Sequence, residues 1–421
     1  MEVHITPSAL HGSVEAVSSK SMAHRLMILA SLAQQPCDVI CNATSLDIEA
    51  TRRCMDALQR RSRNGDESHT CILDCGESGS TLRFLLPVVC AMGIPARFVR
   101  HGRLAERPLA PLDAQLQEHG AHLEEKDGTL CVKGALRPGR FTLPGDVSSQ
   151  YISGLLLAAP LLNGTTEIWV RKPVQSRPYV ELTIHALKQF GQTVTCSNVN
   201  GCDNDEFERL VVEPTPLRGP SVLTVEGDWS NAAFWLAAGA LEPEGITVSG
   251  LDLLSPQGDR SVMAALSAFG VRIARRGNAV RATFDTPRSA SLDISAIPDL
   301  APPLAAVASV TPGTTTLRNA GRLRLKESDR LETMSAAIQA MGGMATIDGD
   351  DLVIEGVDQL KGGIVDAAND HRIAMMAAVM ATHACGPTTM MGAECVQKSY
   401  PGFWDDYALL GGHVDTEEPQ H

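Results

Sequence analysis

Apolar and polar positions divide the chain into stretches that recur with one pattern. Six stretches, rich in Ala, Leu and Met, are apolar around the whole circumference of a helix, which is typical of buried helices. These predicted helices cover residues 22–33, 82–91, 151–162, 232–241, 301–310 and 373–382. A Gly or Pro break and a β-like run follow each helix, at residues 39–41, 96–99, 165–170, 246–249, 314–317 and 388–391. The alternation of helices and strands predicts an α/β protein.

The recurrence indicates six copies of one unit. Each copy opens on a short cap and contains a second, amphipathic helix, such as residues 178–190 or 328–341. Several copies end this second helix at a glycine, which suits the left-handed conformation of a helix terminus; these are Gly120, Gly191, Gly270, Gly342 and Gly411. Six copies in 421 residues divide naturally into two domains of three, with the seam near residues 225–227. A single solenoid is the competing arrangement.

The charge and the cysteines argue against several classes of protein. A net charge of −13 disfavours a nucleic acid or an anionic membrane as the main partner. We expect no signal peptide and no membrane span, because no apolar stretch has the required pattern or length. The 11 cysteines include no CxxC pair and no complete ligand set for a metal, so we expect reduced thiols and a cytoplasmic protein.

Positive side chains stand at the starts of several predicted helices, where the helix dipole disfavours them. Lys20 and Arg25 lie in the first turns of the first buried helix, and His371 and Arg372 follow the cap of the last one. Arg330 lies in the first turn of an amphipathic helix. Cations at such positions repel unless an anion joins them, so we interpret them as an anion-binding site. Ion pairs with neighbouring carboxylates are the alternative for any single cluster.

Three further stretches fit the same site. Arg322, Arg324 and Lys326 alternate with leucines, and we expect them on one face of a strand. Residues 76–81 form a turn rich in Gly and Ser, and residues 146–150 open a buried helix with two hydroxyls and an amide. Helix capping explains either opening equally well.

Two carboxylates stand beside these cations. Asp299 opens the fifth buried helix, where an ordinary N-cap is the alternative interpretation. Glu327 lies between Lys326 and Arg330, where a favourable first-turn acid is the alternative. If both carboxylates face the cations, they are candidates for proton transfer on an anionic substrate.

The motifs together resemble one family, the 3-phosphoshikimate 1-carboxyvinyltransferases or EPSP synthases. The matching stretches occur in the family's order and cover essentially the whole chain. They are SSKSMAHR (18–25), GESGSTLR (76–83), LAERP (104–108), DVSSQY (146–151), SRPY (176–179), EGDWSNAAF (226–234), IPD (297–299), RLRLKESDR (322–330), NDHRIAM (369–375) and QKSYPGF (397–403).

The resemblance implies a fold of two similar domains. Each is expected to contain three βαβαββ units with buried helices, an inside-out α/β barrel, and the active site is expected in the cleft between the domains. The first domain is expected to comprise residues 20–226. The second is expected to comprise residues 1–19 together with residues 227–421, because the family's N-terminal strand belongs with the C-terminal half.

The resemblance also implies the site residues. Those that match contacts to shikimate 3-phosphate are Lys20, Ser21, Arg25, Ser148, Ser149, Gln150, Ser176, Tyr179, Asp299, Arg322 and Lys326. Those that match contacts to phosphoenolpyruvate are Lys20, Gly79, Arg107, Gln150, Arg330, His371, Arg372 and Lys398. Asp299 matches the base that takes the proton of the shikimate hydroxyl. Glu327, together with Lys20, matches the donor that protonates the methylene carbon.

The implied reaction transfers the enolpyruvyl group of phosphoenolpyruvate to the 5-hydroxyl of shikimate 3-phosphate, a step of the shikimate pathway to chorismate and the aromatic amino acids. No metal or organic cofactor is implied, and we expect a monomer whose partners are these two small molecules. The alternatives are the sister transferase acting on UDP-N-acetylglucosamine and a non-catalytic anion-binding module on the same fold. Glu77, Phe84 and Arg322 depart from the family pattern, which leaves the response to the family's inhibitor glyphosate open.

Overall fold

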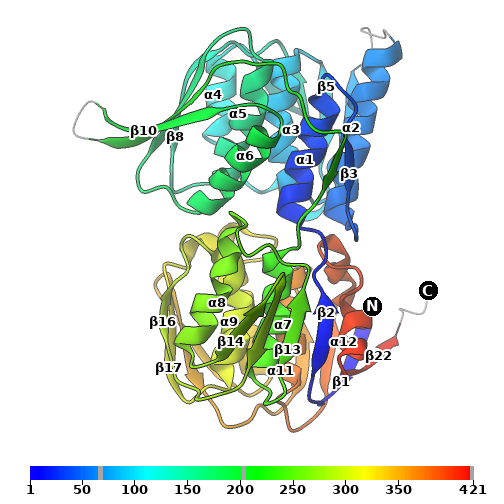
Figure 1. The fold of residues 1–421 in the computed structure, drawn as a ribbon, viewed down its shortest axis with the longest axis vertical. Coiled ribbons are helices and arrows are strands. Elements are labelled where there is room, and N and C mark those ends of the chain that lie inside the picture. The colour runs from blue at the N-terminus through cyan, green and yellow to red at the C-terminus, as the bar shows by residue number, and fades with distance from the viewer. Residues whose placement is uncertain (65–69, 202–204, 418–421) are drawn as a thin grey trace. The chain divides into compact units, whose positions relative to one another are not determined.

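The computed structural model describes residues 1–64, 70–201 and 205–417, and the chain forms two compact units. The first unit comprises Lys20–Asn42 and Leu46–Val225, and the second comprises Met1–Ser19, Ala43–Ser45 and Glu226–His421. Both units are mixed α/β structures (Figure 1), as the alternation of helices and strands predicts. Each unit has its own hydrophobic core.

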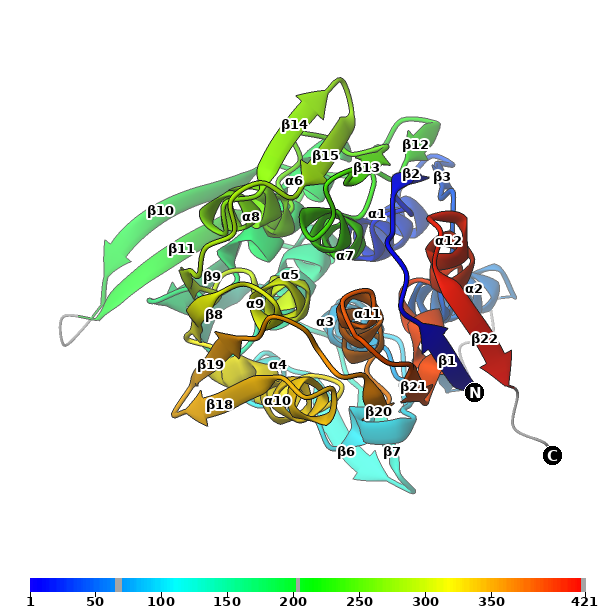
Figure 2. The ribbon, with the colours of Figure 1, turned by 90° about the horizontal axis from the view of Figure 1, so that it is seen from below.

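Six buried helices carry these cores. In the first unit they are α1 (Lys20–Leu32), α3 (Gly79–Met92) and α5 (Ser149–Ala158). In the second unit they are α7 (Trp229–Ala240), α9 (Ala301–Ser309) and α11 (His371–Ala381). Helices α7, α9 and α11 pack against one another (Figure 2). The six predicted helices are therefore confirmed, with ends that differ by a few residues.

Small residues allow these helices to approach closely. Every residue of α7 is buried, and its sequence is rich in alanine. In the first unit, a Cβ on Gly154 of α5 would lie 2.3 Å from the carbonyl oxygen of Arg83 in α3, so a larger side chain would push the two helices apart. N-cap side chains that accept a backbone N–H define the starts of four of these six buried helices; these are Ser78, Ser148, Asp228 and Asp370.

Small sheets of one topology surround the helices of the first unit. Two parallel strands flank α3 and likewise α5, and in each case a hairpin pairs with the second strand. The four-stranded sheets, in spatial order, are β4 (Cys71–Asp74), β5 (Ala96–Val99), β7 (Thr129–Lys133) and β6 (His122–Lys126), and β8 (Gly139–Pro144), β9 (Thr166–Arg171), β11 (Glu206–Val212) and β10 (Val194–Asn200). The third sheet pairs β12 (Val222–Thr224) with β3 (Asp38–Ile40) in parallel.

The second unit repeats this topology three times. Its sheets, in spatial order, are β2 (Gly12–Glu15), β13 (Ile246–Ser249), β15 (Ala279–Thr283) and β14 (Arg272–Arg276); β16 (Ser291–Asp293), β17 (Gly313–Arg318), β19 (Asp351–Gly356) and β18 (Met344–Asp348); and β20 (Gly363–Asp366), β21 (Thr388–Met391), β1 (Glu2–Thr6) and β22 (His413–Glu417). Strand β2 is parallel to β13, and β1 is antiparallel to both β21 and β22. Strands β1 and β2 thus complete two sheets whose other strands come from residues 246–417.

In each repeat, a second helix follows the strand that comes after the buried helix. These helices are α2 (Leu46–Asn64), α4 (Leu112–Glu118), α6 (Arg177–Gln189), α8 (Val262–Ala268), α10 (Arg330–Ala340) and α12 (Phe403–Leu409). The predicted glycines after five of them all have positive φ, at 104°, 78°, 83°, 81° and 98° for Gly120, Gly191, Gly270, Gly342 and Gly411. Within the described residues, no helix combines the length and the apolarity that a membrane span requires.

Candidate active site

The expected site residues of the first unit lie at the starts of its buried helices. Lys20, Gly79 and Ser149 are the first residues of α1, α3 and α5. Backbone N–H groups in a first helical turn have no partner within the helix, so each start favours an anion. Lys20 adds a cation at such a start, and its Nζ donates to Asp47 Oδ2 at 3.0 Å.

Arg25 is a buried cation whose hydrogen-bond partners are all neutral groups. Its Nε donates to Thr183 Oγ1 at 2.7 Å, and its Nη atoms donate to the carbonyl oxygens of Ser21 at 2.6 Å and Tyr179 at 2.9 Å. Among the described residues, no carboxylate oxygen lies within 4.0 Å of the guanidinium. Burial lowers the pKa of Arg25 to about 9. An added phosphate would supply the missing negative charge.

Two further guanidinium groups converge on Gly79. A Cβ at Gly79 would lie 2.6 Å from Arg83 Nη1 and 2.7 Å from Arg107 Nη1. Gln150 fixes the first of these arginines, since its Oε1 accepts from Arg83 Nη1 at 3.1 Å while its Nε2 donates to Ser80 Oγ at 3.1 Å. Arg107, like Arg25, has no carboxylate oxygen within 4.0 Å in the described part of the chain. The absence of a side chain at Gly79 therefore lets both guanidinium groups approach the start of α3.

Three serines complete the first unit's expected set. Ser148 caps α5 and accepts the backbone N–H of Gln150 at 3.3 Å, and Ser149 is buried. Ser176, immediately before α6, is buried in the left-handed conformation with φ 54°. A non-glycine residue in this conformation is strained, and such strain is common at functional sites.

The two departures from the family pattern in this unit have defined surroundings. The Glu77 carboxylate lies against Gly102, where an added Cβ would be 2.8 Å from Glu77 Cδ. The Phe84 ring is buried, with its centre 4.7 Å from Arg25 Cζ and 6.3 Å from the centre of the His24 ring. Phe84 therefore contributes a cation–π contact to the cation that neutral groups hold.

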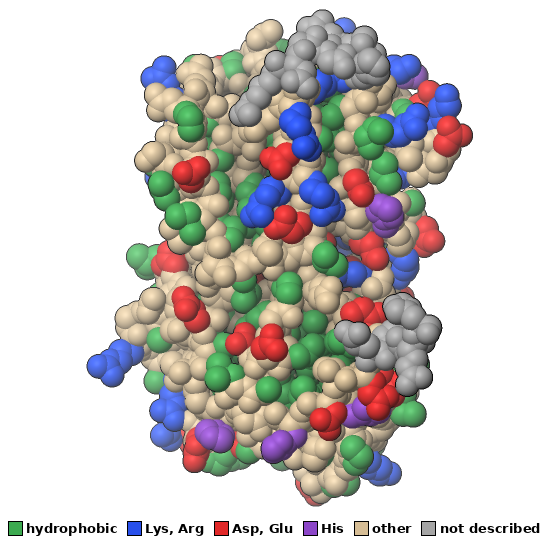
Figure 3. Space-filling model, turned by 90° about the vertical axis from the view of Figure 1, so that its right-hand side faces the viewer, with side chains coloured by type: hydrophobic (Ala, Val, Ile, Leu, Met, Phe, Trp, Pro, Cys, Tyr) green, Lys and Arg blue, Asp and Glu red, His purple; other side chains and the backbone are tan. Residues whose placement is uncertain are grey.

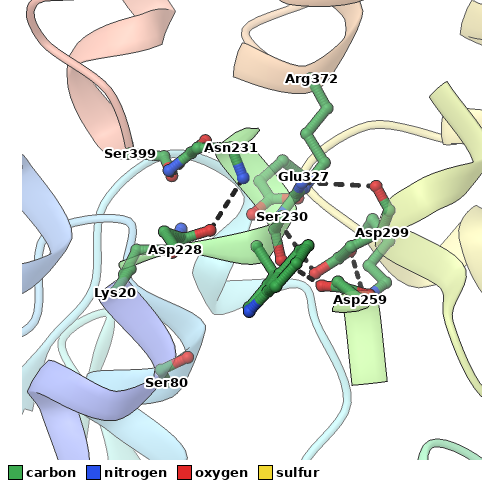
Figure 4. Close-up of polar contacts among 12 residues, drawn as sticks. Lys20, Ser80, Asp228, Ser230, Asn231, Asp259, Asp299, Glu327, Arg372 and Ser399 are labelled. Atoms are coloured by element: carbon green, nitrogen blue, oxygen red, sulfur yellow. Dashed lines mark hydrogen bonds and ion pairs between the residues drawn. The ribbon is translucent and has the colours of Figure 1, made fainter. Parts of the chain in front are cut away.

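In the second unit, the Asp299 carboxylate bonds to three cations. Its Oδ1 accepts from Lys326 Nζ at 3.4 Å and Arg330 Nη1 at 3.0 Å. Its Oδ2 accepts from Arg372 Nη2 at 3.1 Å (Figure 4). Asp299 lies within the short 3-10 helix η5 (Pro298–Leu300), and its side chain caps neither η5 nor α9. The N-cap interpretation of Asp299 is therefore wrong, and the carboxylate belongs to the cationic cluster.

Arg330, the first residue of α10, is the most enclosed of these cations. Its Nε donates to Asp370 Oδ2 at 2.9 Å and its Nη2 donates to Glu327 Oε2 at 2.6 Å. The side chains of Arg330 and Asp370 are 1% and 0% exposed. Burial lowers the pKa of Arg330, but Asp370, Glu327 and Asp299 outweigh burial and hold it above its ordinary value. This guanidinium remains charged whether or not substrate is bound.

The positive charge of Lys326 is stabilised less than that of Arg330. Burial lowers the pKa of Lys326 below its ordinary value; the Asp299 carboxylate opposes this effect, and Arg330 adds to it. Arg322 also lowers this pKa, so its charge acts on the same amine. An amine with a lowered pKa is suited to proton exchange as well as to anion binding.

The remaining residues of the second unit gather around the start of α11. His371 and Arg372 are its first two residues, and both are buried. The α11 cap, Asp370, accepts the backbone N–H of Arg372 at 3.0 Å. Lys398 ends the 3-10 helix η7 (Ala393–Lys398), and its Nζ donates to the carbonyl oxygen of Asn369 at 2.8 Å. The structure thus brings Lys398 to the helix start that carries His371 and Arg372.

One structural expectation is wrong. Arg322, Arg324 and Lys326 do not lie on one face of a strand, because residues Gly321–Leu325 form the 3-10 helix η6. Leu323 is buried while Leu325 is 49% exposed, so the two leucines do not share a face. Arg324 is directed to Asp329 and Glu332, at 3.2 Å and 3.1 Å, and not to Asp299.

Sequence reasoning missed the partners that hold the cations. Asp47 and Thr183 carry no local signal, since they contact Lys20 and Arg25 from 27 and 158 positions away. Asp370 was expected only as a helix cap, and its contact with Arg330 depends on the packing of α10 against α11. Ser80 had a signal, because it lies in the GESGSTLR motif.

Charged side chains on the surface are arranged differently from those of the candidate site. On the face shown in Figure 3, Lys and Arg side chains are interspersed with Asp and Glu. Exposed pairs, such as Arg52 with Glu49 at 2.7 Å, are screened by water and stabilise little. The site's cations are instead buried or half-buried, where an electrostatic contact is stronger.

Repeated α/β units with cations at helix starts, and with carboxylates held among those cations, define an enzyme of anionic substrates that uses acid–base chemistry. The family model described as EPSP synthase (3-phosphoshikimate 1-carboxyvinyltransferase) matches residues 5–407. The chain belongs to this family of enolpyruvyl-transferring enzymes.

Curated relatives carry the same family name. The 3-phosphoshikimate 1-carboxyvinyltransferase of Clostridium kluyveri is 38% identical, with 98% of each chain covered, and that of Clostridium perfringens is 36% identical, with 99% of this chain and 100% of the relative covered. The solved EPSP synthase of Acinetobacter baumannii shares the fold with a TM-score of 0.78, at 23% identity, over 99% of this chain and 100% of that one. These names favour the expected enzyme over the sister transferase.

Proposed function

We propose that the chain transfers the enolpyruvyl group of phosphoenolpyruvate to the 5-hydroxyl of shikimate 3-phosphate and releases phosphate, the activity of its family. The observation that carries the proposal is the Asp299 carboxylate, which bonds to three cations instead of capping a helix. A carboxylate in such a setting can take a proton while the cations bind the anionic groups of the substrates.

The first unit supplies the larger part of the shikimate 3-phosphate site in this proposal. The neutral partners of Arg25 leave its charge available to the phosphate group. The hydroxyl and amide groups around the start of α5 provide directional hydrogen bonds. The residues assigned to this substrate are Lys20, Ser21, Arg25, Ser148, Ser149, Gln150, Ser176 and Tyr179, with Asp299, Arg322 and Lys326 from the second unit.

Phosphoenolpyruvate is assigned to the cations of both units. Arg107 and the start of α3 at Gly79 suit one anionic group, and the cluster at the starts of α10 and α11 suits another. The residues assigned to this substrate are Lys20, Gly79, Arg107, Gln150, Arg330, His371, Arg372 and Lys398.

The chemistry then proceeds by addition and elimination. Asp299 takes the proton of the 5-hydroxyl, whose oxygen bonds to the central carbon of phosphoenolpyruvate, while Glu327 with Lys20 delivers a proton to the methylene carbon. The tetrahedral intermediate next loses a proton from the new methyl group, the carbon–oxygen bond to phosphate breaks, and phosphate leaves. The paired carboxylates stabilise positive charge that develops on the central carbon, and the cations stabilise the departing phosphate.

The direct test is turnover by the purified chain. With both substrates present, we expect equimolar release of phosphate and formation of the enolpyruvyl ether, which mass spectrometry detects. Omission of shikimate 3-phosphate is the control. Phosphate release with UDP-N-acetylglucosamine, and none with shikimate 3-phosphate, would instead support the sister activity.

The domain boundaries, the oligomeric state and the location of the protein are also part of this proposal. We assign the two three-repeat domains to residues 20–226 and to residues 1–19 with 227–421. A monomer with only small-molecule partners stays a prediction, which sedimentation of the purified chain tests. A cytoplasmic location fits the use of free cysteines in the described chain.

A further inference from the structure

Gln257 lies where the chain enters and leaves the second unit. Residues 17–19 and 226–228 run side by side there, since Ser19 N–H donates to the Glu226 carbonyl at 2.7 Å and Asp228 N–H donates to the Val17 carbonyl at 2.8 Å. Ser19 is the last residue of the second unit before Lys20, and Glu226 is its first residue after Val225. The crossings at Ser19–Lys20 and at Val225–Glu226 therefore depend on how these two segments are held.

The Gln257 amide holds both segments at once. Its Nε2 donates to Glu226 Oε1 and to the Gly227 carbonyl, both at 2.9 Å, while its Oε1 accepts from Ser19 Oγ at 3.2 Å and from the Trp229 N–H at 3.1 Å. The side chain amide thus uses both donors and accepts two hydrogen bonds. All four partners lie at the crossings or at the first residue of α7.

The surroundings fix this amide in one orientation. Gln257 is 8% exposed. Ser255 Oγ accepts the Gln257 N–H at 3.1 Å and donates to Glu226 Oε1 at 2.9 Å, so the carboxylate that receives the amide is itself held. Gly227 is packed so closely that a Cβ there would lie 2.4 Å from the Gly250 carbonyl oxygen. The next residue, Asp228, begins α7 by accepting the Asn231 N–H (Figure 4).

We propose that Gln257 is a positioning residue for the reaction: by holding Ser19 against Glu226 and Gly227, it fixes the chain one peptide bond before Lys20. This inference rests on the proposed function, because Lys20 is the residue assigned to both substrates and to proton delivery. A shift of about 1 Å in such a group can cost up to ~10²-fold in rate. Gln257 touches no substrate and acts through Lys20.

The chain offers a matched control for this test. Gln192 is 2% exposed, and its amide also makes four hydrogen bonds: its Nε2 donates to the carbonyls of Thr193 and Glu213, and its Oε1 accepts from the N–H and hydroxyl of Thr215. These partners lie away from the chain crossings. Gln192→Leu therefore removes an equally satisfied buried amide without changing the support of Lys20.

The first experiment compares kcat of Gln257→Leu and Gln192→Leu in the complete chain. We expect kcat to fall at least tenfold in Gln257→Leu and to change less than twofold in Gln192→Leu, although both lose thermal stability. Equal kcat values in the two variants would overturn the proposal. A double variant provides the second criterion: in a Lys20→Met background, Gln257→Leu should change the residual rate less than twofold, and a full tenfold loss there contradicts action through Lys20.

A measurement without turnover separates this inference from the proposed function. Hydrogen exchange at the amides of Ser19 and Asp228 should be faster in Gln257→Leu than in Gln192→Leu and the unchanged protein. Unchanged exchange would show that Gln257 does not hold the crossings. Absence of phosphate release from the unchanged protein would refute the proposed function alone, and the exchange comparison would still decide whether Gln257 holds these segments.

Discussion

Two arginines of the first unit and two arginines of the second have opposite kinds of partner. In the first unit, Arg25 and Arg107 have no carboxylate oxygen within 4.0 Å among the described residues, and the contacts of Arg25 are hydroxyls, carbonyls and a ring. In the second unit, Arg330 and Arg372 bond to the carboxylates of Asp370 and Asp299. The charge of a cation with neutral partners is not balanced until an external anion binds. The charge of a cation with carboxylate partners is already balanced within the protein.

The difference has a physical consequence for the reaction. A buried charge without an opposite charge is costly, so the first unit gains most when a substrate phosphate binds. The second unit already has its negative charges, and two of them, Asp299 and Glu327, are the carboxylates assigned to proton transfer. We therefore expect changes at Arg25 and Arg107 to affect mainly binding, and changes at Asp299 and Arg330 to affect mainly kcat or folding.

The largest expected effect comes from the charge of Asp299. Asp299→Asn keeps the shape of the side chain but removes the base, and we expect kcat to fall about 10²–10⁴-fold with smaller changes in both KM values. Asp293→Asn is the matched control, since the Asp293 carboxylate belongs to the same repeat and binds Ser295 and Asn319. Steady-state phosphate release measures both variants. A loss confined to KM would remove Asp299 from the catalytic step.

The next largest effect is expected on the stability of the fold, where substitutions of Arg330 and Arg25 should differ. Arg330→Met leaves the carboxylate of Asp370 buried without its cation, and we expect a loss of about 3–5 kcal/mol in the free energy of unfolding. Arg25→Met removes a buried cation that has no carboxylate partner, and we expect a change below ~1 kcal/mol.

Urea unfolding with and without shikimate 3-phosphate measures both changes. The substrate should stabilise the unchanged protein and have much less effect on Arg25→Met. Equal destabilisation by the two substitutions in the absence of substrate would break the distinction between the units.

A smaller effect is expected at Gly79. The Cβ of Gly79→Ala would collide with the ends of two flexible side chains, Arg83 and Arg107, which must then move. We expect the KM for phosphoenolpyruvate to rise roughly tenfold, a loss of about 1.4 kcal/mol, with little change in kcat. Gly154→Ala is not a suitable control, because it would disturb the packing of α3 against α5. Gly402→Ala is suitable, since a Cβ at Gly402 would meet no atom within 4 Å.

The smallest effect concerns the alkaline limb of the pH profile. Burial lowers the pKa of Lys326, so its positive charge is present at low pH and is lost as pH rises through a value below that of an ordinary lysine. We expect kcat/KM to fall on that limb as the cation disappears. Lys326→Arg should move the limb upward by about one pH unit or more, because a guanidinium does not titrate there. An unchanged limb would assign it to another group.

Much of the site was predictable because helix starts can be recognised locally. Lys20, Gly79, Arg330 and His371 are the first residues of helices, as the caps and the apolar stretches indicate. The alternation of Arg and Leu in residues 322–326 led to a wrong strand prediction, because Gly321–Leu325 form a 3-10 helix. A period of two does not determine a strand in so short a segment, and of the two leucines only Leu323 is buried.

By itself, the sequence determined the six buried helices, the glycines that end the amphipathic helices and the presence of cations at helix starts. These features depend on periodicity and on backbone conformation within a few residues of one another. Only the tertiary structure decided that Arg25 is held by Thr183, that Arg330 is held by Asp370 and that Gln257 bonds to both Ser19 and Glu226. Those partners are distant along the chain, and their contacts depend on the packing of whole repeats, which no local pattern encodes.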